Sequence, residues 1–103
     1  MDKTIRRSRA EGSVTAPSSK SYAQRAVAAA LLCEGTSTLT NMILCDDTRA
    51  ALQVAADLGA EVEAGTDGTT YTVRGGLRPH AQAIHIGESG LAARLFTPIA
   101  ALC

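Results

Sequence analysis

The residues best suited to chemistry in this sequence surround the start of a predicted helix, where Ser18-Ser19-Lys20-Ser21 is followed by Arg25. Ser21 and Arg25 are four residues apart, so a helix places them on one face. Backbone N–H groups, the positive end of the helix dipole, an ammonium group and a guanidinium group would then converge near one anion. The simpler interpretation, which is commoner for N-terminal serines, is a helix cap beside two solvated cations.

Two further helix starts carry similar chemistry. Gly87-Glu88-Ser89-Gly90 is followed by Arg94, and glycines at a strand-to-helix turn let a ligand approach the backbone. The spacing matches neither a Walker A nor a dinucleotide-binding motif, and the carboxylate of Glu88 would repel a phosphate. The third start, Asp46-Asp47-Thr48-Arg49, is typical of an N-cap, a second acid that complements the helix dipole and a surface arginine.

The remaining reactive side chains form no recognisable site. Cys33, Cys45 and Cys103 have no CxxC spacing and no histidine cluster nearby, so we expect reduced thiols, a cytoplasmic protein and no metal site. His80 and His85 lack the partners of a catalytic triad. The sequence therefore predicts neither a metal nor a cofactor.

The charge balance and the length of the chain exclude further classes of function. Ten basic and ten acidic residues cancel, which argues against a nucleic-acid-binding or membrane-binding surface. No stretch approaches the roughly 20 apolar residues of a membrane span. With 103 residues, 46% of them hydrophobic and few aromatic, the chain is one domain at most and marginal in stability. An anion site must then come from local placement of charge.

The elements that would position these residues alternate along the chain. Residues 4–15 alternate loosely, as one or two strands do, and Ala16-Pro17 then breaks the pattern. The further predicted elements are a helix over 20–33, a strand over 36–43, a helix over 49–58, a hairpin of 61–64 and 69–74, a short strand over 83–86, and a last helix from residue 91. This order indicates the α/β class.

The end of the sequence is a long apolar segment. Residues 95–103 stay apolar and compatible with a helix, although Pro98 is expected to kink it. Because natural domains seldom stop within an apolar helix, we expect the chain to be a truncated piece of a longer protein. We also expect this helix to expose apolar surface and the chain to self-associate.

Several ordered runs match the motifs of one family. Residues 17–26 read Pro17-Ser18-Ser19-Lys20-Ser21-Tyr22-Ala23-Gln24-Arg25-Ala26, which is similar to P-G-S-K-S-x-S-x-R-A. Glu34-Gly35-Thr36-Ser37-Thr38-Leu39, Asp46-Asp47-Thr48-Arg49 and Leu58-Gly59-Ala60 follow at that family's intervals. Gly87-Glu88-Ser89-Gly90-Leu91-Ala92-Ala93-Arg94 resembles its G-N-A-G-T-A-x-R segment. Taken together, these runs resemble the 5-enolpyruvylshikimate-3-phosphate synthases, an enolpyruvyl transferase family.

This resemblance implies a transferase of aromatic amino acid biosynthesis. It would move the enolpyruvyl group of phosphoenolpyruvate to the 5-hydroxyl of shikimate-3-phosphate and release phosphate. Lys20 would be catalytic and contact phosphoenolpyruvate, while Ser21 and Arg25 would hold shikimate-3-phosphate. Gly90 would line the phosphoenolpyruvate pocket through its backbone, with Asp47 and Glu88 as further substrate-binding candidates. No cofactor, nucleic acid or membrane is implied as a partner, and the full enzyme is expected to be a monomer.

The resemblance also implies an architecture of two lobes, each built from repeated βαβαββ units. Residues 1–15 would be a strand segment of the other lobe. Residues 16–103 would form the first α/β unit of the substrate-binding lobe and the start of the next unit. The acid/base carboxylates and further cations would lie outside this chain, so we expect the chain to be inactive alone.

Among the departures from the family's motifs, Ser18 replaces a Gly, Glu88 an Asn and Leu91 a Thr. Glu88 and Leu91 are expected to reshape the phosphoenolpyruvate pocket and to change the tolerance of glyphosate. Two other enzyme or binding functions stay open: a relative that uses UDP-N-acetylglucosamine, which is disfavoured because Ser21 rather than Asn follows the lysine, and a standalone module that binds phosphorylated metabolites. A third alternative is an inert α/β interaction domain.

Overall fold

The computed structural model describes residues 2–103, which form three helices and three strands. The helices are α1 (Lys20–Leu32), α2 (Asp46–Asp57) and α3 (Gly90–Ala100), and the strands are β1 (Thr36–Leu39), β2 (Glu61–Ala64) and β3 (Tyr71–Arg74). Both β1 and β2 pair antiparallel with β3, so the strand order is β1-β3-β2. This mixture of helices and strands is consistent with the predicted α/β class.

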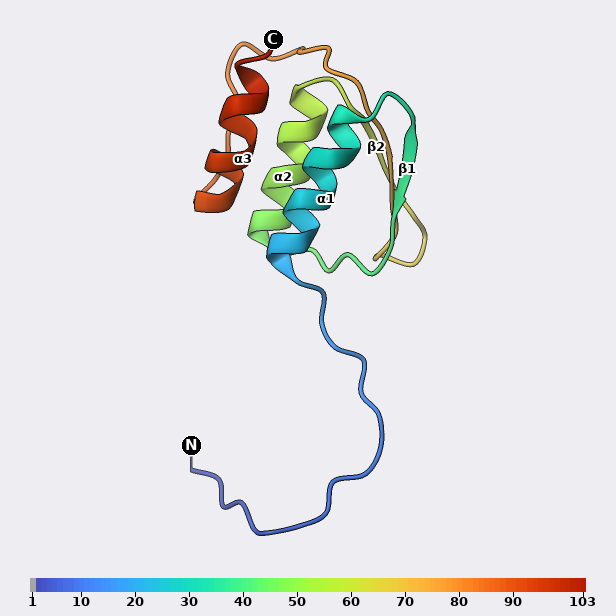
Figure 1. Ribbon diagram of the computed structural model, residues 1–103, viewed down its shortest axis with the longest axis vertical. Helices are drawn as coiled ribbons and strands as arrows, with labels where there is room; N and C mark the ends of the chain where they lie inside the picture. Colours follow the sequence, from blue (N-terminus) through green and yellow to red (C-terminus); the bar gives the residue numbers. More distant parts are fainter. Residues whose placement is uncertain (1) are drawn as a thin grey trace.

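The elements are stacked in layers (Figure 1). Helices α1 and α2 cover one face of the sheet, and α3 packs on their far side without contacting a strand. Apolar residues recur at helical spacing on α1 and α2 and therefore face inward. The largest fully buried apolar side chains come from all three layers: Phe96, Leu31, Leu58, Val27, Val54 and Val73.

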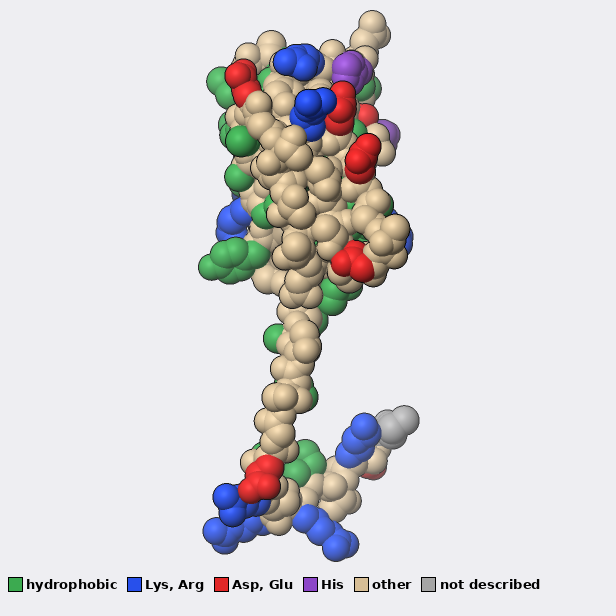
Figure 2. Space-filling model, turned by 90° about the vertical axis from the view of Figure 1, so that its right-hand side faces the viewer, with side chains coloured by type: hydrophobic (Ala, Val, Ile, Leu, Met, Phe, Trp, Pro, Cys, Tyr) green, Lys and Arg blue, Asp and Glu red, His purple; other side chains and the backbone are tan. Residues whose placement is uncertain are grey.

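The sheet has one buried and one solvent-facing side. In β3, Tyr71 and Val73 are buried, whereas Arg74 is exposed and lies 3.8 Å from Glu61 of β2. This is the period-2 alternation of a strand that covers a core with one face only. Figure 2, viewed from the side of the sheet, shows mostly backbone and uncharged polar side chains over this part of the molecule, with a few charged groups.

The segment before α1 is extended and unpaired. Residues 2–17 are exposed and carry no strand, and they run away from the helices (Figure 1). Residues 4–15 thus form no strand in this chain, because a strand needs a neighbouring edge and none of the described edges pairs with this segment. That the segment is a strand of another lobe stays a prediction. Its basic residues gather at the far end of the molecule (Figure 2), where Lys3, Arg6, Arg7 and Arg9 are exposed. Met1 lies outside the described residues.

Other predicted boundaries shift for identifiable reasons. The expected strand over residues 83–86 is absent, and Ile84 and Ile86 instead pack against the core from a loop. The first strand stops at Leu39 rather than residue 43, because the chain turns at Asn41 with a φ of 56°. Helix α2 begins at Asp46, three residues before the predicted start at Arg49.

Two glycines let the chain pass close to the helix ends. Gly59, just past α2, has a φ of 123°, and a Cβ there would collide with the backbone of Arg78. Gly75, just past β3, lies against the last turn of α1, where a Cβ would collide with the carbonyl oxygens of Ala30 and Cys33. The end of α1 is thus held by backbone that only glycine can provide.

The last helix is better packed than its sequence predicted. Ala92, Phe96 and Ile99 are buried against the rest of the core, and Pro98 lies inside α3 without ending it. Beyond the helix, Leu102 is 72% exposed. Self-association of the chain stays a prediction, with less exposed apolar surface on α3 to support it. Within residues 2–103, no helix has both the length and the apolar character needed to cross a membrane.

Candidate anion-binding site

The starts of all three helices lie at the same end of the molecule, where the N-terminal segment joins α1 (Figure 1). The helices run side by side in one direction. Each start carries backbone N–H groups without intrahelical partners and roughly half a positive charge. The starts of α1 and α3 have no acidic residue in their first turn, whereas Asp46 and Asp47 offset the dipole at the start of α2.

Lys20, the first residue of α1, reaches across to α2. Its Nζ lies 3.1 Å from Oδ2 of Asp47, and the lysine side chain is 62% exposed while that of Asp47 is 30% exposed. The hydrogen bond and the charge of Asp47 raise the pKa of Lys20 above its ordinary value. The ammonium group therefore stays protonated at neutral pH and faces the helix starts.

The start of α2 is capped differently from the prediction. Cys45 is the N-cap residue, and Asp46 and Asp47 lie in the first turn, where their charge complements the helix dipole. The backbone N–H of Cys45 donates to the buried hydroxyl of Thr48 at 2.8 Å. The hydrogen bonds from Thr48 lower the pKa of the Cys45 thiol. Asp47 is thus left to pair with Lys20 instead of capping the helix.

The start of α3 is tied to α1 by Ser89, which lies in a predicted helix start, and by Gln24, which no sequence motif indicated as a functional residue. Ser89 is the N-cap, and its Oγ accepts from the N–H of Ala92 at 3.0 Å. The same hydroxyl donates to Oε1 of Gln24 at 2.8 Å. The signal available in the sequence was the position of Gln24 one helical turn after Lys20, on a face otherwise made of apolar residues.

Arg94 also approaches the start of α3. Its Nη2 lies 3.7 Å from the point where a Cβ of Gly90 would stand, so the guanidinium folds back along the helix toward Gly90. Gly90 and Arg94 are both exposed, and Gly90 has no side chain to cover the backbone of the first turn.

The other predicted site residues lie around this cluster. Ser21 and Arg25 are exposed on α1, and Glu88 is exposed immediately before α3. Five residues of helix turn Arg25 about 140° away from Lys20, so the two cations do not point the same way from α1. The structure therefore brings Lys20 and Asp47 into contact, whereas the shared ligand predicted for Lys20, Ser21 and Arg25 stays a prediction.

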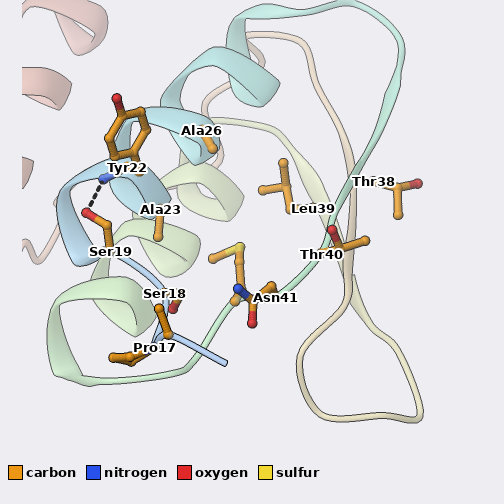
Figure 3. Close-up of a pocket in the computed structure, with 12 residues that line it drawn as sticks. Pro17, Ser18, Ser19, Tyr22, Ala23, Ala26, Thr38, Leu39, Thr40 and Asn41 are labelled. Carbon is orange, nitrogen blue, oxygen red and sulfur yellow. Dashed lines mark hydrogen bonds between the residues drawn. The ribbon is translucent and has the colours of Figure 1, made fainter. Parts of the chain in front are cut away.

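A hollow of about 500 Å³ opens on the sheet side of α1 (Figure 3). It is lined by residues before and within α1, including Pro17, Ser18 and Tyr22, and by Thr38, Leu39 and Asn41 of β1 and its exit. No charged side chain lines it. Ser19 caps α1 at its rim by accepting from the N–H of Tyr22 at 3.3 Å. This hollow is therefore uncharged, and Lys20 does not line it.

Metal-ligating side chains do not gather at the site. Over residues 2–103, no group of three or more His, Cys, Asp or Glu side chains lies close enough to hold a metal ion. The groups of the site that can hold an anion are backbone N–H groups, hydroxyls and the cations Lys20 and Arg94, and the carboxylates of Asp46, Asp47 and Glu88 lie at the same helix starts. The N–H groups, hydroxyls and cations suit a phosphate or carboxylate ligand.

Comparison with known proteins agrees with the motifs. The sequence profile of the family EPSP synthase (3-phosphoshikimate 1-carboxyvinyltransferase) matches residues 5–103. A protein of Methanothermobacter thermautotrophicus named 3-phosphoshikimate 1-carboxyvinyltransferase is 38% identical over 99% of this chain and 25% of its own length. A protein of the same name from Thermococcus kodakarensis is 42% identical over 86% of this chain and 21% of its own length.

Larger proteins contain the same sequence unit. The pentafunctional AROM polypeptide of Schizosaccharomyces japonicus is 38% identical over 86% of this chain, which corresponds to 6% of that polypeptide. The chain thus spans about a quarter or less of the length of these relatives. Because the family profile covers nearly every residue, the resemblance seen in the motifs is confirmed, and the chain belongs to the EPSP synthase family.

Proposed function

We propose that the protein carrying this chain transfers the enolpyruvyl group of phosphoenolpyruvate to the 5-hydroxyl of shikimate-3-phosphate and releases phosphate. The observation that carries the proposal is the convergence of three helix starts and Lys20 at one end of a chain of this family. Both substrates are polyanions, so a site of backbone N–H groups and fixed cations matches their charge.

Each residue has a proposed role in that site. Lys20 places a point charge on phosphoenolpyruvate, held in direction by its ion pair with Asp47. Ser21 and Arg25 hold shikimate-3-phosphate, with the guanidinium suited to bidentate contact with an anionic group. The backbone at Gly90 lines the phosphoenolpyruvate pocket. Addition and elimination at the vinyl ether carbon then benefit from charge neutralisation and positioning before the proton moves.

In this proposal the chain supplies only part of the site. Residues 1–15 contribute a strand to a second lobe, and residues 16–103 form the first unit of the substrate-binding lobe and the beginning of the next. The N-terminal segment is extended and its backbone is unpaired, as a segment that joins the sheet of another lobe must be. The carboxylates that move protons lie in the second lobe, so the chain is inactive alone.

Phosphate release measures this function directly. We expect the full-length protein to release phosphate when both phosphoenolpyruvate and shikimate-3-phosphate are present. We expect no release when UDP-N-acetylglucosamine replaces shikimate-3-phosphate, and none from residues 1–103 alone. Release with the nucleotide sugar instead would assign the protein to the related transferases, and turnover by residues 1–103 would show that the site is complete without the rest.

Glu88 should weaken the binding of phosphoenolpyruvate. Its carboxylate is exposed beside the start of α3, and like charges about 4 Å apart in water repel by about 1 kcal/mol, or about fivefold in affinity. We expect Glu88→Gln in the full-length protein to lower the KM for phosphoenolpyruvate up to about fivefold, with a smaller gain at high salt.

Glu63→Gln is the matched control, because Glu63 is an equally exposed carboxylate on β2, in the sheet and not at a helix start. It should leave the KM unchanged. An unchanged KM in Glu88→Gln as well would place Glu88 outside the reach of the ligand. The same variant tests whether Glu88 alters the tolerance of glyphosate, through the inhibition constant.

A further inference from the structure

The buried polar residues of the chain are concentrated between α1 and α3. Of the three polar residues buried within residues 2–103, namely Gln24, Thr48 and Ser89, two bond to each other. Gln24 is 2% exposed and Ser89 is 6% exposed. Burying an amide and a hydroxyl is unfavourable unless they are paired, so this contact fixes how the two helices meet.

The Ser89 hydroxyl makes two bonds of opposite direction. It donates its proton to Oε1 of Gln24 at 2.8 Å and accepts from the N–H of Ala92 at 3.0 Å. A hydroxyl has only one proton, so the bond to Gln24 determines which lone pair faces Ala92. Gln24 therefore orients the side chain that begins α3, from 65 residues away in sequence.

The same face of α1 also holds the start of α2. Lys20 and Gln24 are four residues apart, which places them one above the other on a helix. Lys20 bonds to Asp47 in the first turn of α2, and Gln24 bonds to Ser89 at the start of α3. Successive positions on one face of α1 thus contact both neighbouring helix starts.

The capping bonds made by Ser89 leave some backbone N–H groups in the first turn of α3 without a partner in the helix. Ser89 satisfies the N–H groups of Ala92, through its hydroxyl, and of Ala93, through its carbonyl oxygen at 3.1 Å. The N–H groups of Gly90 and Leu91 precede these and have no partner within the helix. Their position relative to the ammonium of Lys20 depends on how Ser89 is held.

We infer that Gln24 and Ser89 are a pair of positioning residues, which hold the free N–H groups at the start of α3 in register with Lys20. This inference rests on the proposed function and refines it, because those N–H groups would face phosphoenolpyruvate. Neither side chain touches the substrate. A small displacement of a binding group is enough to lower a rate by orders of magnitude.

Kinetics of the full-length protein with Gln24→Met, with Ser89→Ala and with both substitutions test the pair. We expect each single variant to lower kcat/KM for phosphoenolpyruvate about tenfold, with the KM for shikimate-3-phosphate unchanged. The double variant should be no worse than Ser89→Ala alone, because the bond that Gln24→Met removes is already lost in Ser89→Ala. Ser89→Thr keeps the hydroxyl and should stay within about twofold of the unaltered protein.

Gln53→Met is the matched control, because Gln53 is an exposed glutamine on α2 whose amide donates to Asp57 of its own helix, at 2.9 Å. It should not change either kinetic constant. A lower melting temperature of Gln24→Met with unchanged kcat/KM would overturn the inference, since the pair would then only stabilise the fold. Multiplicative effects in the double variant would also overturn it. If Gln24→Met does not fold, equal kcat/KM values of Ser89→Ala and Ser89→Thr would overturn the inference instead.

A second measurement separates this inference from the proposed function. Absence of turnover by the unaltered protein would refute the function. The pair is then tested by hydrogen exchange of the Ala92 amide, which should be faster in Gln24→Met than in the unaltered protein or in Gln53→Met. Unchanged exchange at Ala92 would show that Gln24 does not hold the start of α3, and would overturn the inference whatever the reaction.

Discussion

Gly75→Ala is expected to destabilise the chain by about 3 kcal/mol, the upper range for overpacking in a tight site. For a domain of this size that corresponds to a fall in melting temperature of roughly 15 °C. A Cβ on Gly75 would stand 2.8 Å from the carbonyl oxygen of Leu31 and would collide outright with those of Ala30 and Cys33. All three obstacles are backbone atoms at the end of α1, so none can rotate away as a side chain would.

The collision also threatens the bonds that end α1. Gly76 donates its N–H to the carbonyl oxygen of Leu31 at 2.7 Å, and Gly75 donates to that of Gly35 at 3.1 Å. Moving the chain aside to admit a methyl group would break these bonds and expose unsatisfied carbonyl oxygens. We therefore expect the loss of packing and of hydrogen bonds to occur together in one cooperative transition.

Thermal unfolding followed by circular dichroism measures this effect. Gly35→Ala is the matched control from the same junction, because a Cβ there would meet only Sγ of Cys33, at an ordinary 3.7 Å. It should change the free energy of unfolding by less than about 0.5 kcal/mol. Equal melting temperatures for Gly75→Ala and Gly35→Ala would mean that β3 does not press against α1 as described.

The helices could be predicted from the sequence because their signals are local. Apolar spacing and the stop at Glu34-Gly35 gave a first helix over residues 20–33, against Lys20–Leu32 in the structure. The last helix was placed from residue 91 and begins at Gly90. Only the start of α2 was misplaced, because an aspartate favours the N-cap and the first turn alike.

Strands were predicted less well because a strand exists only beside a partner. The hairpin of β2 and β3 was found, since its turn supplies a partner within a few residues. Residues 4–15 and 83–86 show suitable alternation, yet no described edge pairs with them. Alternation reports that a segment could be a strand and carries no information on whether an edge is available.

The residues of the site could likewise be predicted from local signals, whereas the contacts between them could not. Lys20 and Asp47 could each be selected from the sequence, because each stands at a helix start in a family motif. Their contact across 27 residues, and that of Gln24 with Ser89 across 65, depend on how the helices pack. Helical periodicity places Gln24 on an inward face but does not name the residue opposite. Partners distant in sequence therefore had to come from the structure.

Lys20→Met in the full-length protein is expected to lower kcat/KM for phosphoenolpyruvate by about a hundredfold or more, the usual loss when a fixed group that stabilises transition-state charge is removed. Methionine retains much of the length of the side chain and removes the ammonium group. Without the cation, the carboxylate of Asp47 also remains at the helix starts, where it would repel the substrate. The effect should therefore exceed that of losing a neutral contact.

Lys3→Met is the matched control, because Lys3 is the only other lysine and lies exposed in the N-terminal segment. It should keep kcat/KM within about twofold, the size of ordinary surface effects. The kcat/KM of Lys20→Arg should lie between those of Lys20→Met and Lys3→Met, since a guanidinium keeps the charge but presents it with a different shape. A Lys20→Met enzyme with nearly full activity would remove Lys20 from the site.

The dependence of activity on pH tests the ion pair separately from the charge itself. Asp47 raises the pKa of Lys20, so the ammonium group is lost only as pH rises through that raised value, and any stabilisation by the pair is present below 10.5. In Asp47→Asn the pKa should return toward 10.5, and the alkaline limb of kcat/KM should move to lower pH. At neutral pH the lysine stays charged in both proteins. Any loss of kcat/KM in Asp47→Asn at that pH should therefore reflect the orientation of the lysine alone. An alkaline limb that does not move would mean that a group other than Lys20 controls it. The catalytic role would then need a different cation, for which Arg94 beside Gly90 is a candidate at a helix start.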